Sequence, residues 1–196
     1  MKELRIVLNG SEDITYELLM NELPYLKSVM HETLRLATIV PRNIKVVVDD
    51  DVLPDGSPVR QGDIIVFSNW CMGRNRRVWG EDAALFVPER WLLDDEDGSE
   101  DIAHAKAKNT PMHGQGTSPF GKFKMENQFK FNSFNAGPRL CLGQTFATLE
   151  AMLTTVLLLQ RLEFQLVPEQ KTPTYRNAAT LMMKNPPLVV VKSIRH

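Results

Sequence analysis

A cysteine lies inside a short loop of glycine and proline at residues 134–143, which read Phe134-Asn135-Ala136-Gly137-Pro138-Arg139-Leu140-Cys141-Leu142-Gly143. The apolar run that follows, residues 145–162, is long enough for a helix of roughly four or five turns. A cysteine just before such a helix lies among free backbone N–H groups, at the positive end of the helix dipole. Both favour the thiolate, which is the form of cysteine that binds metal. Cys141 is therefore a candidate metal ligand.

The residues around Cys141 suit a flat ligand. Gly137 and Gly143 carry no Cβ, so the loop backbone and the start of the helix can approach such a ligand closely. Pro138 restricts the loop, and Arg139 supplies a fixed positive charge that suits a carboxylate. The alternative is a buried structural cysteine at the start of a helix, because most free cysteines are buried.

The loop resembles the haem-ligand signature of the cytochrome P-450 family, Phe-x-x-Gly-x-Arg-x-Cys-x-Gly, at every fixed position. The resemblance implies that Cys141 is the axial thiolate ligand of a haem b iron, whose electron donation favours O–O bond cleavage. It also implies that Arg139 pairs with a haem propionate and that Phe134 packs beside the ring near the sulfur. Gly137 and Gly143 then belong to the cofactor-binding loop.

A carboxylate and a guanidinium lie three residues apart in Glu32-Thr33-Leu34-Arg35, on one face of an expected helix. Exposed pairs of this spacing are commonplace. Glu-x-x-Arg is, however, also the second signature of the same family, in which a later Pro-Glu-Arg-Phe/Trp segment supplies a third partner. Pro88-Glu89-Arg90-Trp91 matches that segment. The resemblance thus implies that Glu32, Arg35 and Arg90 form a buried structural cluster that holds the haem-loop region in place. No catalytic residue beyond the haem ligand is identifiable.

The segment after the Glu32 helix runs past the haem edge in this family and lines the substrate pocket. By that resemblance Arg42 is a second propionate partner, and residues 37–41 are substrate contacts. A solvated arginine at the start of a strand is the alternative for Arg42, because surface arginine is common.

Three further segments resemble the fatty-acid ω-hydroxylase branch of plant and fungal cytochromes P-450. They are Asp51-Val52-Leu53-Pro54-Asp55-Gly56, Cys71-Met72-Gly73-Arg74 and Trp79-Gly80-Glu81-Asp82-Ala83. In that branch they are scaffold residues that do not touch substrate. A fatty-acid substrate is therefore an analogy with relatives.

The composition is that of an ordinary globular protein, with 196 residues, 43% hydrophobic residues and a net charge of -1. The sequence contains no Lys/Arg-rich block of the kind that would indicate a nucleic acid as a partner. Two cysteines argue against a disulfide framework and indicate a reducing compartment. No apolar segment is long enough to span a membrane, and no signal peptide is evident. These features alone predict a soluble, intracellular protein.

We expect one partial domain over residues 1–196, mainly α-helical with small antiparallel β-sheets. The apolar spacing predicts a helix over residues 23–36, with Pro24 in its first turn. Turns at Pro54-Asp55-Gly56 and Gln61-Gly62 predict a small antiparallel sheet of hairpins. The strands of this sheet are expected at residues 44–48, 57–60 and 63–67.

Residues 94–123 are acidic, then polar and rich in glycine and serine, which predicts a flexible surface insertion. Residues 162–167 and 188–192 are expected to be two strands of a terminal hairpin. Met152, Met182 and Met183 are predicted to lie in the core. Cys71 is interpreted as a buried or an incidental thiol.

The resemblance covers only the C-terminal part of the family, whose members are typically more than twice this length. The long helix with an Ala/Gly-Gly-x-x-Thr segment, which delivers protons to bound dioxygen, has no counterpart here. We therefore expect a truncated product or a split half. The function hypothesis is a haem-thiolate monooxygenase that inserts one oxygen atom of O2 into a C–H bond of a lipophilic substrate, plausibly a fatty acid.

Electrons for that reaction would pass from NADPH through a reductase that docks on the Cys141 side. Relatives of full length are expected at the endoplasmic reticulum membrane, although this chain shows no anchor. Two alternatives remain open. One is a haem-binding fragment without turnover, and the other is a haem-free remnant whose helices expose apolar faces.

Overall fold

The structure, a computed structural model, describes residues 1–9, 13–93, 120–168, 173–176, 178 and 180–194. Within these residues, helices predominate over short antiparallel strands, which confirms the predicted fold class. The α-helices are α1 (Lys2–Leu8), α2 (Pro24–Leu36), α3 (Asn69–Met72), α4 (Arg76–Trp79) and α6 (Gln144–Arg161). Shorter helical turns are the π-helical η1 (Leu18–Glu22) and the 3-10 turns η2 (Pro88–Trp91) and η3 (Gly137–Arg139).

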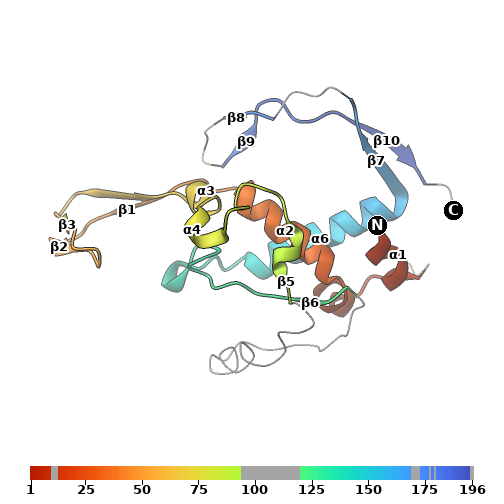
Figure 1. The fold of residues 1–196 in the computed structure, drawn as a ribbon, viewed down its shortest axis with the longest axis horizontal. Helices are drawn as coiled ribbons and strands as arrows, with labels where there is room; N and C mark the ends of the chain where they lie inside the picture. Colours follow the sequence, from red (N-terminus) through yellow and green to blue (C-terminus); the bar gives the residue numbers. More distant parts are fainter. Residues whose placement is uncertain (10–12, 94–119, 169–172, 177, 179, 195–196) are drawn as a thin grey trace.

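The helix predicted over residues 23–36 is α2, which lies at the centre of the molecule beside α6 (Figure 1). Pro24 occupies its first turn, where the missing N–H group costs nothing. The carboxylate of Glu3 reaches over from α1 and accepts hydrogen bonds from the backbone N–H groups of Tyr25 and Leu26, both at 2.8 Å. A negative charge at this end complements the dipole of α2, so the contact fixes α1 against α2.

An apolar core forms where α1, η1, α2 and α6 meet. Its buried members are Leu4, Leu8, Leu19, Leu23, Leu26, Met152 and Val156. The burial of Met152 confirms its predicted core position, and α6 begins and ends within one residue of the predicted bounds. None of the helices in the described part of the chain combines the length and the apolarity that crossing a membrane requires.

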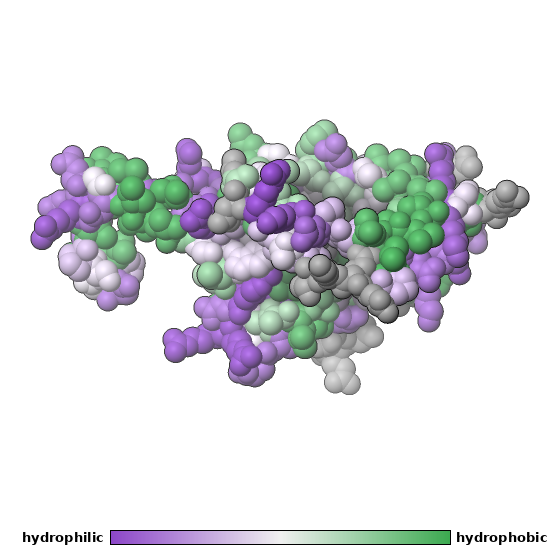
Figure 2. Space-filling view, turned by 90° about the horizontal axis from the view of Figure 1, so that it is seen from above, coloured by the Kyte–Doolittle hydropathy of each residue, from purple (hydrophilic) through white to green (hydrophobic). Residues whose placement is uncertain are grey.

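The predicted hairpins form an arm that projects from the helices (Figure 1, left). In the arm, β1 (Asn43–Val46) pairs with β4 (Ile64–Phe67), and β2 (Asp51–Val52) pairs with β3 (Pro58–Val59). The strands thus make two separate two-stranded sheets and not the single sheet that we predicted. The exposed side chains of Ile44, Val46, Ile64 and Val66 contribute to the hydrophobic surface of the arm (Figure 2, left).

The last two residues of the predicted insertion, residues 94–123, form a strand. Residues 94–119 lie outside the described residues, but β6 (Lys122–Phe123) pairs with β5 (Leu92–Leu93). The ring of Phe123 stacks parallel to Trp91 at a centroid distance of 6.3 Å and contacts the His31 ring at 4.6 Å. The end of the predicted insertion therefore belongs to the packed part of the protein, because Phe123 has aromatic partners there.

The predicted terminal hairpin is confirmed as β7 (Leu162–Leu166) paired with β10 (Val189–Ser193). Between them, β8 (Tyr175–Arg176) pairs with β9 (Met182–Met183), which the sequence did not predict because each strand has only two residues. Met182 and Met183 are both exposed, so their predicted core position is wrong. The apolar residues in this part of the chain thus belong to a strand whose side chains are exposed and not buried.

Candidate functional site

The loop that carries Cys141 closes on itself. Asn135 and Gly137 adopt left-handed backbone conformations, with φ of 64° and 61°, which turn the chain into η3. The backbone N–H of Cys141 then donates to the carbonyl oxygen of Phe134 at 2.9 Å. Glycine tolerates the left-handed region without strain, and asparagine tolerates it better than most residues. The loop therefore has a defined shape around the cysteine.

Cys141 lies immediately before α6, and its thiol is exposed. Its carbonyl oxygen accepts a hydrogen bond from the N–H of Gln144 at 3.3 Å, and Gly143 is the N-cap residue of α6 without a side-chain cap. A Cβ atom built on Gly143 would lie 3.9 Å from the Cys141 sulfur. Glycine at this position thus leaves open the space beside the sulfur. The exposure also excludes the alternative of a buried structural cysteine.

Large apolar side chains within five residues of Cys141 are exposed to solvent. Leu142 is fully exposed (104%), Phe146 in the first turn of α6 is 71% exposed, and Leu140 is exposed as well. A flat, mostly apolar cofactor with a metal centre could bind the free thiol through its metal and cover the exposed apolar groups next to it. The donor set and its surroundings therefore fit haem.

The two arginines predicted to pair with haem propionates are both exposed. Arg139 is the last residue of η3, two residues before Cys141, and Arg42 lies between α2 and β1. Neither guanidinium makes an ion pair with another residue that the structure describes. Both are therefore available to a carboxylate. Phe134 is half-buried and packs against the aromatic cluster of Trp79, Trp91 and Phe131.

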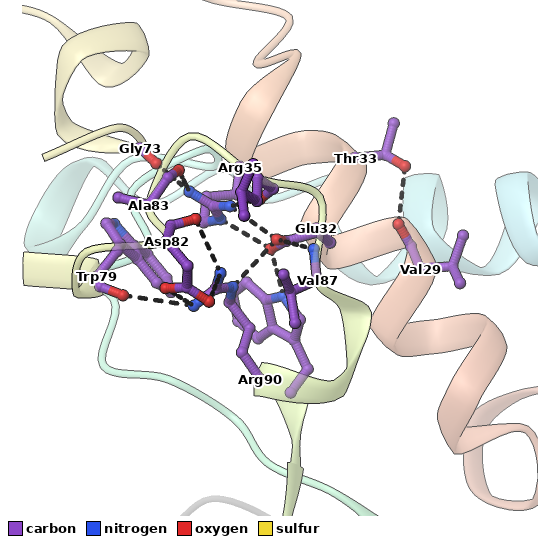
Figure 3. Close-up of polar contacts among 12 residues, drawn as sticks. Val29, Glu32, Thr33, Arg35, Gly73, Trp79, Asp82, Ala83, Val87 and Arg90 are labelled. Atoms are coloured by element: carbon purple, nitrogen blue, oxygen red, sulfur yellow. Dashed lines mark hydrogen bonds and ion pairs between the residues drawn. The ribbon is translucent and has the colours of Figure 1, made fainter. Parts of the chain in front are cut away.

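Glu32, Arg35 and Arg90 lie together in the interior (Figure 3). Glu32 is 0% and Arg35 is 1% exposed, so the solvated-pair interpretation does not apply. Arg35 donates to both Glu32 oxygens at 2.7 Å, in a bidentate pair, and Arg90 Nε donates to Glu32 Oε1 at 3.0 Å. Bidentate arginine–carboxylate pairs combine high strength with fixed geometry.

Two further donors reach Glu32 that the sequence did not indicate. The backbone N–H of Val87 donates at 2.8 Å, and the indole Nε1 of Trp91 donates at 3.0 Å. Burial acts to raise the pKa of Glu32, but the hydrogen bonds, led by that from Arg35, outweigh it and hold the pKa below its usual value. We refer to Glu32, Arg35 and Arg90 with these donors as the Glu32 cluster.

The remaining donors of the two arginines tie distant segments together. Arg35 donates to the carbonyl oxygens of Gly73, Ala83 at 2.6 Å and Leu85 at 2.9 Å. Arg90 pairs with Asp82 at 3.0 Å. Sequence reasoning missed Asp82 as a partner, although it lies in the segment Trp79-Gly80-Glu81-Asp82-Ala83 that we had noted as scaffold.

Packing connects the Glu32 cluster to the loop of Cys141. The ring of Trp91 meets Phe131 edge-on at 4.8 Å, and Ser133 Oγ donates to the carbonyl oxygen of Leu34 in α2 at 3.0 Å. Phe131 and Ser133 come directly before Phe134, where the loop begins. The structure thus attaches the start of the loop to α2.

Cys71 and His31 have no part in this site. Cys71 is exposed in α3, so its interpretation as a buried thiol is wrong and the incidental thiol remains. His31 is buried among Trp91, Phe123 and Phe131, and burial lowers its pKa to about 4. It is therefore a neutral core residue at physiological pH.

Comparison with known proteins agrees with this geometry. The family model for cytochrome P-450 matches residues 1–191. The chain is 37% identical over 164 residues to cytochrome P-450 704B1 of Arabidopsis thaliana, and 37% identical over 171 residues to cytochrome P-450 monooxygenase cyp1 of Mycosarcoma maydis. It is 34% identical over 181 residues to cytochrome P-450 704C1 of Pinus taeda. These matches cover 84%, 83% and 92% of the chain, but only 26%, 23% and 30% of the relatives.

Proposed function

Because the chain belongs to the cytochrome P-450 family, we propose that it carries the haem-thiolate site of a monooxygenase. This enzyme would insert one oxygen atom from O2 into a C–H bond of a lipophilic substrate. The observation that carries the proposal is the exposed thiol of Cys141 in a closed loop whose neighbouring residues in the sequence include exposed apolar side chains. The chain spans about a quarter of the length of the relatives named above, so the activity concerns the whole enzyme.

Four residues of the loop, together with Arg42, have a role in holding the cofactor. The Cys141 thiolate would ligate the haem iron, and Gly143 leaves the space beside the sulfur open. The hydrogen bond from the Cys141 N–H to Phe134 fixes the position of the ligand, because it closes the loop. Arg139 and Arg42 bind the propionate carboxylates, for which both guanidinium groups are available.

The Glu32 cluster positions the loop and takes no part in the reaction. Glu32 and Arg35 are buried, and the Arg90 side chain is only 13% exposed and pairs with Glu32, so the cluster presents almost nothing to a substrate. Through Trp91 and Phe131 the cluster holds the segment that leads into Phe134. A fixed loop keeps the sulfur in place when the cofactor is absent, which is the preorganisation that a metal site requires.

Haem iron, when bound, supplies the activation of dioxygen, with electrons that pass from NADPH through a reductase. The reductase would dock on the Cys141 side of the protein. The same family membership supports an intracellular location, with the membrane of the endoplasmic reticulum as the proposed site.

We propose a fatty acid as the substrate. The support is the resemblance of three scaffold segments to the fatty-acid ω-hydroxylase branch, together with an apolar surface on the segment after α2. In that segment Ile39 is 53% exposed, and Val40 is exposed beside it. Apolar side chains on residues 37–41 suit a lipophilic chain better than a polar substrate.

Turnover by the haem-reconstituted chain tests the proposal. The expected result is NADPH-dependent and reductase-dependent hydroxylation of dodecanoic acid, detected by mass spectrometry and absent from the Cys141→Ala protein. Cys71→Ser is a matched control, because Cys71 is exposed like Cys141 but lies far along the chain in α3. Bound haem with no NADPH-driven product would show that this chain by itself is a haem-binding fragment without turnover.

A further inference from the structure

Three consecutive carbonyl groups after α2 are held by two distant parts of the chain. The carbonyl oxygen of Ile39 accepts a hydrogen bond from the N–H of Leu181, next to β9, at 2.7 Å. The carbonyl oxygen of Val40 accepts one from Asn69 Nδ2 at 3.1 Å, and that of Pro41 accepts one from the N–H of Trp70 at 3.3 Å. The backbone that presents Ile39 and Val40 is thus fixed from both α3 and the β8–β9 hairpin.

One side chain connects these two parts. The ring of Trp70, in α3, meets the ring of Tyr175, in β8, edge-on with the centroids 5.3 Å apart. The guanidinium of Arg74 lies over the same Trp70 ring at 3.5 Å, and its Nη1 donates to the Trp70 carbonyl oxygen at 3.3 Å. Arginine over an indole face is the most favourable type of cation–π contact, and an edge-on aromatic pair adds to it.

The Glu32 cluster fixes the other side of α3. The carbonyl oxygen of Gly73, the C-cap residue of α3, accepts a hydrogen bond from buried Arg35. A Cβ atom on Gly73 would lie only 2.2 Å from the Arg35 carbonyl oxygen, so α3 packs directly against the backbone of α2. A rigid α3 therefore presents Trp70 to a hairpin of only two residues per strand, which has little stability of its own.

We propose that Trp70 is a positioning residue that couples the β8–β9 hairpin to α3 and thereby fixes residues 39–41 for contact with substrate. The inference rests on the proposed function, because that function makes residues 37–41 substrate contacts. Trp70 itself would touch neither substrate nor cofactor. It acts through the hydrogen bonds that the hairpin donates to Ile39 and that α3 donates to Pro41. The geometry of these bonds depends on the positions of the hairpin and α3 relative to residues 39–41.

Amide hydrogen exchange, measured by NMR on the haem-reconstituted full chain, tests the coupling directly. In Trp70→Ala, the Leu181 amide should exchange about ten-fold faster, because the hairpin loses its aromatic contact. The Val87 amide, which donates to Glu32, should exchange at the wild-type rate. Trp70→Phe keeps an aromatic ring and should restore the Leu181 rate to within about two-fold of wild type. Tyr175→Ala breaks the same contact from the exposed hairpin and should reproduce the effect of Trp70→Ala.

Titration with dodecanoic acid, followed by the shift of the haem Soret band, supplies the second measurement. Trp70→Ala should raise the half-saturating concentration several-fold, and Trp70→Phe should leave it near the wild-type value. Unchanged Leu181 exchange in both Trp70→Ala and Tyr175→Ala overturns the coupling. Faster exchange with unchanged dodecanoic acid binding overturns the link to substrate. If the wild-type protein binds haem through Cys141 but shows no shift with dodecanoic acid, the fatty-acid proposal fails, and the exchange rates alone decide the role of Trp70.

Discussion

Packing contacts connect the Glu32 cluster to the Cys141 loop, but the two regions differ in how far their polar and apolar groups have partners within the chain. Both oxygens of Glu32 accept several hydrogen bonds, and aromatic rings cover the cluster. The Cys141 loop exposes its thiol, its apolar side chains and the charge of Arg139. A region whose polar groups are all paired within the chain contributes to stability, whereas a region with exposed and unpaired groups can bind a ligand. Substitutions in the two regions should therefore separate stability from cofactor binding.

The largest effect on stability is expected at Glu32. Glu32→Ala leaves Arg35 buried without its carboxylate, and this should lower the free energy of unfolding by about 3–5 kcal/mol. Urea denaturation measures the change. Glu81→Ala is the control, because the Glu81–Arg76 pair is exposed at 3.4 Å and should contribute less than about 1 kcal/mol. Equal effects of the two substitutions would show that the Glu32 cluster acts as an ordinary surface pair.

The burial of His31 predicts a loss of stability at mildly acidic pH. Its folded-state pKa of about 4 lies below the ordinary value of 6.5, so the unfolded state binds a proton more readily. The stability from neutral His31 is complete above pH 6.5 and is lost as the pH falls toward 4, up to about 3 kcal/mol.

Urea denaturation between pH 7 and 4.5 measures this loss. His31→Phe retains an aromatic ring in the same surroundings and should flatten the dependence in this range. Because the pKa of Glu32 is lowered, protonation of Glu32 reduces stability only below its ordinary value of 4.5. The effects of His31 and Glu32 on stability therefore fall in different pH ranges. A wild-type slope that persists in His31→Phe would assign the titration to another group.

A smaller effect is expected from a methyl group at Gly73. The added Cβ would meet the Arg35 carbonyl oxygen at 2.2 Å, so α3 must move from α2 at a cost of about 1–3 kcal/mol. Thermal unfolding of Gly73→Ala measures the cost. Gly143→Ala is the matched control, since its nearest atom, the Cys141 sulfur, would lie at an ordinary 3.9 Å. Similar melting temperatures for the two variants would indicate that α3 is not packed as described.

The smallest effect on stability is expected at Arg139. Its side chain is exposed and unpaired among the described residues, so Arg139→Ala should change the unfolding free energy of the apoprotein by less than about 0.5 kcal/mol. Haem affinity, measured by titration, should nevertheless fall several-fold because a propionate partner is lost. Unchanged haem affinity would remove Arg139 from the cofactor site.

The sequence predicted the regions with strong local patterns. The loop around Cys141, the helix α2 and the order of the Glu32, Arg90 and Cys141 segments could all be identified, because each depends on a motif or a periodic repeat. The aromatic partner of Phe123, the indole donor of Trp91 and the contact of Trp70 with Tyr175 could not. They depend on tertiary contacts between residues far apart in the chain, which no local pattern records. The exposure of Met182 and Met183 was missed for a similar reason, since apolar character does not say which face of a short strand is covered.

The absorption spectrum of the reduced, haem-reconstituted chain under carbon monoxide tests the assignment of Cys141 most directly. We predict the strongly red-shifted Soret band of thiolate ligation in the wild-type chain and in Cys71→Ser, and its loss in Cys141→Ala. A red-shifted band that survives in Cys141→Ala would show that Cys141 is not the thiolate ligand.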